Sequence, residues 1–176
     1  ITLLPDAYRL IPTQGRGNVH QFDSMWEHVR ILADHHDYEA VNSEFRTFAF
    51  DTLLDMLGAS AWESFALAYL IMEHEFIPTG LSTGRTLPIA DIVGRQRTSR
   101  SRIVAQCKKH SAPHPIDSDF LNLSSSLRRH DLAFYFAYGA CTGDVPSNIQ
   151  IIDRVLALQW ADTANGRLYR DLLLRD

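Results

Sequence analysis

The sequence is short of lysine, of cysteine and of long apolar runs, and the last two shortages exclude whole classes of protein. No window approaches the ~18 uncharged apolar residues of a membrane span. Residues 1–12 lack the basic start and apolar run of a secretory signal. The only cysteines are Cys107 and Cys141, too few for a disulfide-rich secreted domain, so we expect reduced thiols in a cytoplasmic protein. The chain has no initiator methionine, and we expect it to be a piece of a longer protein.

The composition is that of a soluble globular domain, with 45% hydrophobic and 22% charged residues in a chain of 176. The net charge is −4, but it is unevenly distributed. The segment Gly84–His130 carries nine basic against three acidic side chains, a net +6 that leaves −10 for the remainder. This split predicts a basic face suited to a polyanion. An arginine-rich solvated loop is the alternative that charge alone leaves open.

Lysine is used at one place only. The chain has 15 arginines and two lysines, which are the adjacent Lys108 and Lys109. Arginine is permanently charged and forked, whereas lysine is a compact point charge whose pKa can move. The contrast directs attention to this position as a candidate functional site.

Hydrophobic periodicity predicts helices, then a mixture of strands and helices. The predicted helices cover residues 24–34, 39–57, 61–73, 117–129, 154–160 and 167–174, and the predicted strands cover residues 87–93, 102–108, 132–138 and 149–152, with a short extended stretch after Phe76. This order predicts an α/β fold with a mixed central sheet and helices on both faces, in which the strands at 102–108 and 132–138 are parallel. Residues 1–58 form a helical N-terminal segment, an extension or docking region, and residues 59–176 form the main domain.

A polar group of residues stands out against these apolar strands. Side chains alternate along a strand, so Gln106 and Lys108 project to one side while Cys107 faces the other. Asp91 is a charged residue within the apolar strand predicted at 87–93. If the two strands are adjacent and antiparallel, these groups lie within a few ångströms of each other. A hard divalent cation is the natural compensation for a carboxylate, an amide oxygen and nearby carbonyls.

The motif Pro88–Asp91, followed by Gln106–Lys108, resembles the PD-(D/E)xK signature of restriction-endonuclease-like nucleases. It is most similar to the branch, including Mrr-type enzymes, in which glutamine replaces the second acid. The resemblance covers roughly Ser60–Ile152. It implies an αβββαβ core and a metal-dependent endonuclease that hydrolyses DNA with Mg²⁺, or Mn²⁺ as a substitute, in restriction or another defence against foreign DNA.

The resemblance also implies roles for individual residues. Asp91, the side-chain oxygen of Gln106 and the carbonyl of Cys107 would bind the metal, and Lys108 would orient or deprotonate the attacking water. Because glutamine removes one negative charge, a further carboxylate is expected, and Glu63 on the first core helix is the candidate. The alternative for Glu63 is a capping box with Ser60. The alternative for Asp91 is a carboxylate satisfied by turn amides or an arginine.

Other basic residues are candidates for contact with nucleic acid. Four arginines lie in or beside the predicted hairpin loop, which we expect next to the site: Arg95, Arg97, Arg100 and Arg102. Lys109 and His110 follow the motif as further candidates, and His114 flanks the same proline-rich loop. The expected partner is DNA, with RNA left open and no membrane. We expect a homodimer or a part of a larger multidomain protein.

Two other functions remain open at this stage. The domain could be a catalytically inactive nucleic-acid-binding module, which metal binding would discriminate. It could also be an assembly module of a larger protein, which a test of DNA binding would discriminate.

Overall fold

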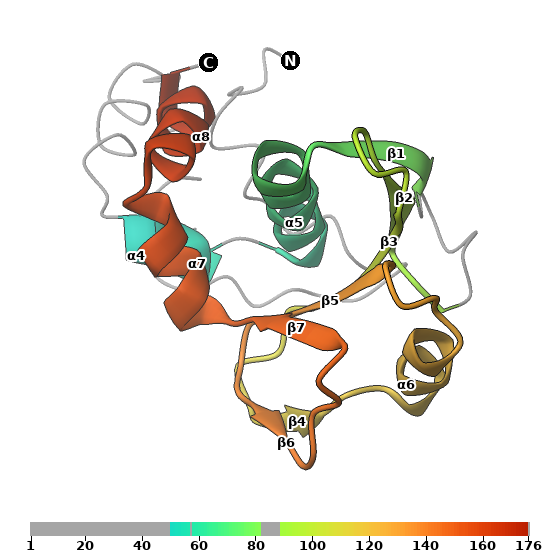
Figure 1. Ribbon diagram of the computed structural model, residues 1–176. Coiled ribbons are helices and arrows are strands. Elements are labelled where there is room, and N and C mark those ends of the chain that lie inside the picture. The colour runs from blue at the N-terminus through green and yellow to red at the C-terminus, as the bar shows by residue number, and fades with distance from the viewer. Residues whose placement is uncertain (1–49, 57, 82–88, 176) are drawn as a thin grey trace, which may run out of the picture.

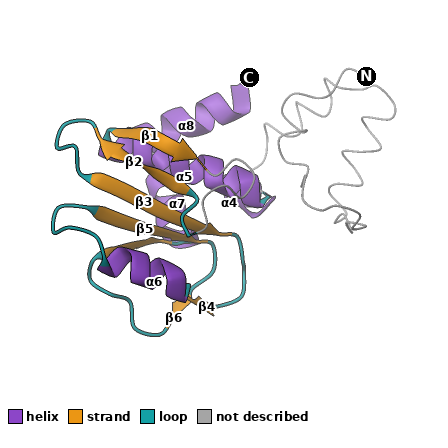
Figure 2. Ribbon diagram, turned by 90° about the vertical axis from the view of Figure 1, so that its right-hand side faces the viewer, coloured by secondary structure: helices purple, strands orange, loops and turns teal. Residues whose placement is uncertain are grey.

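A five-stranded sheet lies between two helical layers in the computed structural model, which describes residues 50–56, 58–81 and 89–175 (Figure 1). The predicted α/β class with a mixed sheet is therefore confirmed. Its strands are β1 (Phe76–Leu81), β2 (Ile92–Gln96), β3 (Arg102–Lys108), β5 (Leu132–Ala137) and β7 (Ile149–Ile152). The helices on one side of the sheet are α4 (Phe50–Met56), α5 (Ala59–His74), α7 (Arg154–Ala161) and α8 (Ala164–Arg175), and α6 (Ser118–Ser125) covers the other side (Figure 2).

The strand order is β1-β2-β3-β5-β7, antiparallel for the first three strands and parallel from β3 onward. The predicted parallel pairing across α6 is thus confirmed. As a result, the C-terminal ends of β3 and β5 lie at the same edge of the sheet. A second sheet pairs β4 (His114–Pro115) with β6 (Cys141–Thr142). It was not predicted, because a segment with prolines at 113 and 115 indicates a loop.

The strand predicted at 87–93 is wrong in its bounds. Strand β2 begins at Ile92 and continues through Arg95 and Gln96, which the sequence assigned to a loop. The pairing with β3 determines this register, with Arg95 opposite Arg102 and Ile92 opposite Ala105. Gly94 permits the register, because a Cβ here would come within 2.3 Å of the carbonyl oxygen of Ile77 in β1.

The sheet has a separate hydrophobic core on each face. Between α5 and the sheet lies one buried cluster. It includes Trp62 and Phe65 of α5 and Phe134 and Phe136 of β5. On the other face a second cluster contains residues of β3, β5 and α6, including Tyr135. Strand β5 contributes to both clusters, as a strand buried on both faces should. Among the described residues, no helix is long and apolar enough to cross a bilayer.

Helix α4 packs into the same core as α5, although the predicted boundary at 58 assigns it to the N-terminal segment. Phe50 and Leu54 belong to the same buried cluster as Trp62. The helix coincides with the end of the one predicted at 39–57. The helix predicted at 24–34 and residues 39–49 lie outside the described residues. Residues 50–56 therefore share a core with the domain that follows.

The indole of Trp62 anchors the first turns of α5 to β5, and its Nε1 donates a hydrogen bond to the buried carbonyl of Phe136 at 3.0 Å. Trp62→Phe keeps an aromatic ring but leaves this carbonyl without its donor. We expect a loss of about 1–3 kcal/mol in the free energy of unfolding, measured by denaturant titration. Trp160→Phe is the matched control and should lose less. The indole of Trp160 donates to Glu73, an exposed carboxylate that water can solvate when the donor is removed. Equal losses of unfolding free energy in the two variants would show that the hydrogen bond from Trp62 to Phe136 has no special role.

Candidate active site

The start of β2 and the end of β3 meet at one edge of the sheet because the two strands are antiparallel. Asp91 immediately precedes β2, and its backbone amide donates to the carbonyl of Ala105 at 2.9 Å. The backbone amide of Cys107 donates in turn to Asp91 Oδ2 at 2.7 Å. The carboxylate of Asp91 therefore lies against the segment Gln106–Lys108. One of its oxygens is satisfied by a strand amide, not by the turn amides or arginine that the sequence offered as alternatives.

Lys108 forms an ion pair with a residue that sequence reasoning did not select. Its Nζ lies 2.6 Å from Oδ2 of Asp117, and the two side chains are 27% and 43% exposed. Asp117 is the N-cap of α6 but makes no capping hydrogen bond with its side chain. Because α6 starts the return from β3 to β5, its N-terminal end lies near the end of β3. The only signal in the sequence was an acidic residue at a helix start, which normally indicates a cap.

Glu63 lies close enough to Asp91 for their charges to interact. Burial raises the pKa of Glu63 above its ordinary value, and the charge of Asp91 raises it further. The capping-box alternative is wrong, because α5 begins at Ala59 with Gly58 as its N-cap and Ser60 is already inside the helix. Nothing about the helix start requires a glutamate at 63.

Burial dominates the electrostatics of Asp91. It raises the pKa of this carboxyl, and the charge of Asp117 adds to the rise, whereas the Cys107 amide and Lys108 oppose it. Burial also raises the pKa of the Cys107 thiol well above its ordinary value, with further contributions from the charges of Asp91 and Glu63. Three carboxylates therefore share this edge of the sheet with one ammonium group.

The side-chain oxygen of Gln106 is buried and accepts no hydrogen bond from any described residue. A buried acceptor without a donor is costly, and a metal ion is one group that could satisfy it. The carboxylates of Asp91 and Glu63, whose charges interact, and the side-chain oxygen of Gln106 are of the kind that a hard divalent cation takes as ligands. Cys107 could contribute only its carbonyl, because its thiol stays protonated.

The possible ligand set is small. Within the described part of the chain, no three histidine, cysteine, aspartate or glutamate side chains are grouped so that they could hold a metal ion. A cage built entirely from such side chains is therefore not formed there. Two carboxylates and an amide oxygen would leave further positions to water and substrate, which is the arrangement that Mg²⁺ commonly takes.

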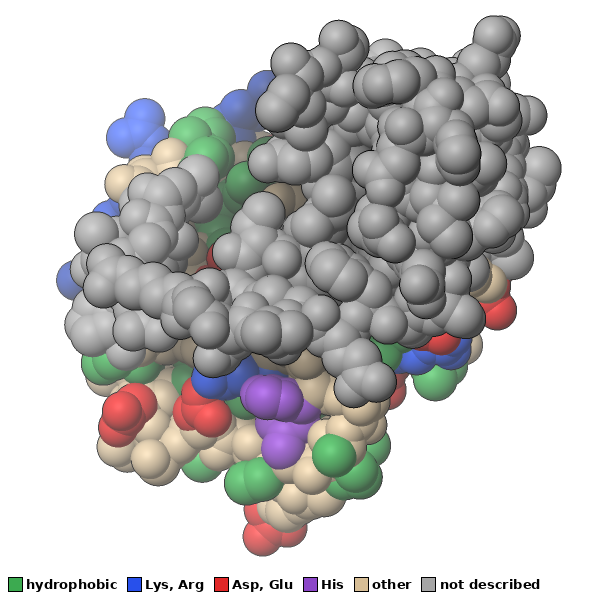
Figure 3. All heavy atoms as spheres, turned by 180° about the vertical axis from the view of Figure 1, so that it is seen from behind, with side chains coloured by type: hydrophobic (Ala, Val, Ile, Leu, Met, Phe, Trp, Pro, Cys, Tyr) green, Lys and Arg blue, Asp and Glu red, His purple; other side chains and the backbone are tan. Residues whose placement is uncertain are grey.

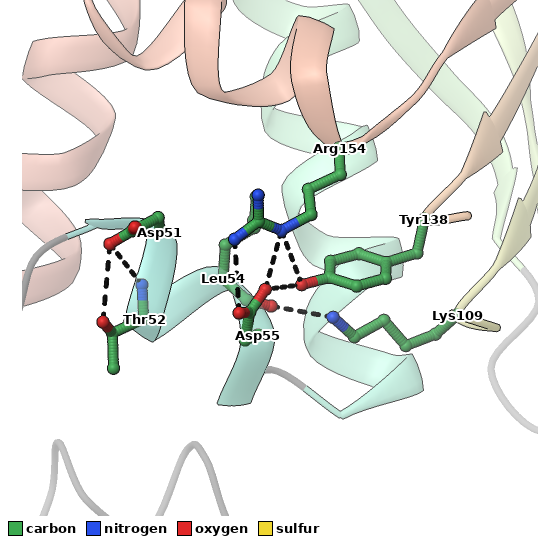
Figure 4. Close-up of polar contacts among 7 residues, drawn as sticks. All are labelled: Asp51, Thr52, Leu54, Asp55, Lys109, Tyr138 and Arg154. Atoms are coloured by element: carbon green, nitrogen blue, oxygen red, sulfur yellow. Dashed lines mark hydrogen bonds and ion pairs between the residues drawn. The ribbon is translucent and has the colours of Figure 1, made fainter. Parts of the chain in front are cut away.

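Lys109, a predicted phosphate contact, points toward α4 (Figure 4). Its Nζ donates to the carbonyl of Leu54 at 2.7 Å and lies 3.0 Å from the centre of the Tyr138 ring. Burial lowers its pKa to about 7, although the charge of Asp55 opposes this. Asp55 also accepts hydrogen bonds from Tyr138 and Arg154. Contact with a phosphate would require this ammonium group to leave the contacts that hold α4.

The hairpin arginines lie at the opposite end of the two strands from Asp91 and Lys108. Strand β3 has seven residues, so its ends are separated by about 20 Å. The expected position of the loop next to the site is therefore wrong. Arg97 forms an exposed ion pair with Glu75 at 3.6 Å, and Arg95 donates to the carbonyl of Arg100 at 2.8 Å. Arg102 is exposed where β3 begins.

The two histidines of the proline-rich loop are neighbours, with ring centres 5.7 Å apart. His110 is exposed, whereas Nε2 of His114 is buried. Figure 3 shows histidine side chains on the surface seen from behind, with acidic and basic side chains beside them. Gly139 allows the backbone of this loop to pass closely, since a Cβ here would meet the carbonyl oxygen of His110 at 2.6 Å.

Comparisons of this chain with family models, with curated proteins and with solved structures find no match.

The raised pKa of Asp91 has a consequence for stability. A carboxyl whose pKa is higher in the folded state favours folding while it is protonated, and this contribution is lost as the pH rises through the folded pKa. Asp91→Asn keeps an oxygen to accept from Cys107 and cannot ionise. At pH 7 and without metal we expect it to melt at a higher temperature than the wild type, with a difference that shrinks as the pH falls toward the ordinary value of 3.8.

Asp144→Asn, in an exposed loop, is the control and should leave the melting temperature unchanged. A lower melting temperature for Asp91→Asn at pH 7 would show that the carboxylate stabilises the fold.

Proposed function

We propose that this chain is a divalent-metal-dependent nuclease of the restriction-endonuclease-like class that hydrolyses phosphodiester bonds in DNA. The observation that carries the proposal is the hydrogen bond of Asp91 to the end of β3, which brings its carboxylate to Gln106 and Lys108. A carboxylate, an amide oxygen and an ammonium group supply the metal ligands and the positive charge that this hydrolysis needs. The strand order, with α5 before β1 and α6 between β3 and β5, is what an αβββαβ core requires.

Asp91, Glu63 and Gln106 are the residues that we propose to hold Mg²⁺, with Mn²⁺ as a substitute. A bound ion of this kind lowers the pKa of a coordinated water and offsets negative charge on the phosphate. Burial raises the pKa of Glu63 and the charge of Asp91 raises it further, and a cation placed between the two carboxylates would relieve this repulsion.

Lys108 would supply positive charge to the reacting phosphate. Its ion pair with Asp117 restricts the ammonium group to this edge of the sheet, so less conformational freedom remains to be lost when substrate binds. Asp117 is thus proposed as a positioning residue that acts through Lys108. In the reaction the water oxygen would form a bond to phosphorus while the bond from phosphorus to the ester oxygen breaks. The water would give up a proton, and the departing ester oxygen would take one up.

The arginines at the far end of β3 fit a long substrate. A duplex rises ~3.4 Å per base pair, so about six base pairs are needed to extend over the length of β3. We propose that DNA contacts both ends of the strand, and that restriction or another defence against foreign DNA is the setting, as the resemblance implies.

A second candidate function is a binding or assembly module without catalysis. The ion pair between Lys108 and Asp117 favours it, because this pair already neutralises the ammonium group that catalysis would use. The two functions differ in whether purified protein cleaves nucleic acid when Mg²⁺ or Mn²⁺ is added.

Asp91→Ala and Lys108→Ala test the proposal directly. Each should lower the rate of DNA cleavage by at least about 100-fold, because one removes a metal ligand and the other removes charge stabilisation of the phosphate. Cleavage of single- and double-stranded DNA and RNA is measured with Mg²⁺ and with Mn²⁺, after circular dichroism has shown that each variant is folded.

Asp144→Ala, which removes an exposed aspartate, is the matched control and should cleave like the wild type. If either site variant cleaves DNA at close to the wild-type rate, the proposed catalytic site is wrong. A wild type that cleaves none of the four substrates would support the second candidate.

Replacing Arg97 and Arg100 together by alanine should weaken binding in a length-dependent way. A duplex of about 20 base pairs should bind less tightly, and its salt dependence should flatten by about one unit for each phosphate that the arginines no longer neutralise. A duplex of about four base pairs cannot reach from the site to the loop, so its affinity should not change. Binding is measured by fluorescence anisotropy over a range of salt concentrations. Unchanged affinity for the long duplex at every salt concentration would show that the loop is only a solvated turn.

A further inference from the structure

Three buried polar atoms in this structure have no hydrogen-bond partner among the described residues. They are Oε1 of Gln106, Nε2 of His114 and the hydroxyl of Tyr135. Tyr135 is 0% exposed, so its hydroxyl cannot be satisfied by bulk solvent. Buried polar groups without partners are rare in folded proteins, and each calls for an explanation.

The three atoms come from neighbouring positions on one side of the sheet. Gln106 and Tyr135 are paired residues on the parallel strands β3 and β5, so their side chains lie next to each other on the same face. The ring centre of His114 lies 6.2 Å from that of Tyr135. The same face carries Lys108, two residues beyond Gln106. The three atoms thus border the proposed site and extend it toward α6.

The hydrogen-bonding character of each atom follows from its surroundings. The hydroxyl of Tyr135 carries a hydrogen that it can donate. The backbone amide of Asp117 approaches the same oxygen, but an amide N–H can only donate, so the hydroxyl hydrogen still lacks an acceptor among the described residues. Nδ1 of His114 faces the carbonyl of Ala112 at 3.1 Å, and a carbonyl can only accept. In a neutral ring Nδ1 therefore carries the hydrogen, and Nε2 is an acceptor.

One donor and two acceptors are what a single water molecule needs. Such a water donates its two hydrogens to Gln106 and His114 and accepts one from Tyr135. One of its lone pairs then remains free for attack on an electrophile. The amide oxygen of Gln106 has two lone pairs, so it can accept from this water and still contribute to metal binding.

We propose that Gln106, His114 and Tyr135 hold the water that attacks the phosphate, which makes His114 and Tyr135 catalytic residues of the same site. The inference rests on the proposed nuclease function and deepens it. The proposed water also explains why position 135 carries a hydroxyl. The Tyr135 ring packs beside Phe120 in a hydrophobic core, where a phenylalanine ring could make the same contact. A residue that orients the attacking water should act on the chemical step more than on substrate binding.

Tyr135→Phe is the decisive variant, because it removes only the hydroxyl. We expect kcat for cleavage of a DNA duplex with Mg²⁺ to fall by at least about tenfold while KM changes by less than about twofold. The melting temperature of the metal-free variant should stay close to that of the wild type, because the partner proposed for the hydroxyl is a water molecule and not another group of the protein. Tyr69→Phe removes a hydroxyl on the opposite face of the sheet and should leave kcat unchanged.

Two substitutions of His114 separate its acceptor from its loop contact. His114→Asn can keep the hydrogen bond to Ala112 but has no acceptor at the position of Nε2, so kcat should fall as for Tyr135→Phe. His114→Gln can place an oxygen near that position and should recover part of the loss. His130→Asn, in an exposed turn, is the control and should retain full activity.

The outcomes distinguish this inference from the function on which it rests. An active wild type together with an unaffected Tyr135→Phe would overturn the inference and leave the nuclease proposal intact. A Tyr135→Phe variant that melts several degrees lower would also overturn it, because the hydroxyl would then have a structural partner. If the wild type cleaves no nucleic acid, the nuclease function fails first and the inference fails with it.

Discussion

The hydrogen bond from the Cys107 amide to the Asp91 carboxylate determines where the polar edge of this sheet forms. Together with the bond from the Asp91 amide to the Ala105 carbonyl, it fixes the start of β2 against the end of β3. A shift of one residue in this pairing would move Gln106 and Lys108 to the face under α5, which is packed with aromatic rings. The ion pair with Asp117 and the approach of Glu63 both depend on this register.

Much of the fold could be predicted from local patterns, and the errors have physical causes. Strands β3 and β7 have the predicted bounds, because each is an apolar run with clear polar limits. The predicted bounds of β2 were shifted toward the N-terminus, because pairing with neighbouring strands determines where this strand lies. The pairing with β3 includes the polar Arg95, whereas the apolar Ile89 lies outside the strand. The two-residue strand β4 exists through pairing with β6, and no local pattern reveals such a pair.

The candidate site was predictable only in part, for a similar reason. Gln106 and Lys108 lie on β3, and Asp91 immediately precedes the adjacent strand β2. Alternation along β3 and antiparallel pairing with β2 therefore suffice to bring them together. Asp117 and Tyr135 reach the same edge through the crossover to β5, and in the sequence they look like a helix cap and a core aromatic residue. The hairpin arginines show the opposite error. They are close to the motif in sequence, but an extended strand carries them about 20 Å from it.

The charges at this edge explain why an amide suits position 106 better than an acid. Asp117 balances the charge of Lys108, which leaves the carboxylates of Asp91 and Glu63 in a half-buried setting where burial raises the pKa of both. A third uncompensated carboxylate at position 106 would add to this repulsion and to the free-energy cost of burying charge. Glutamine at position 106 places an oxygen at this edge without adding a further negative charge, which keeps the free-energy cost of folding the edge lower.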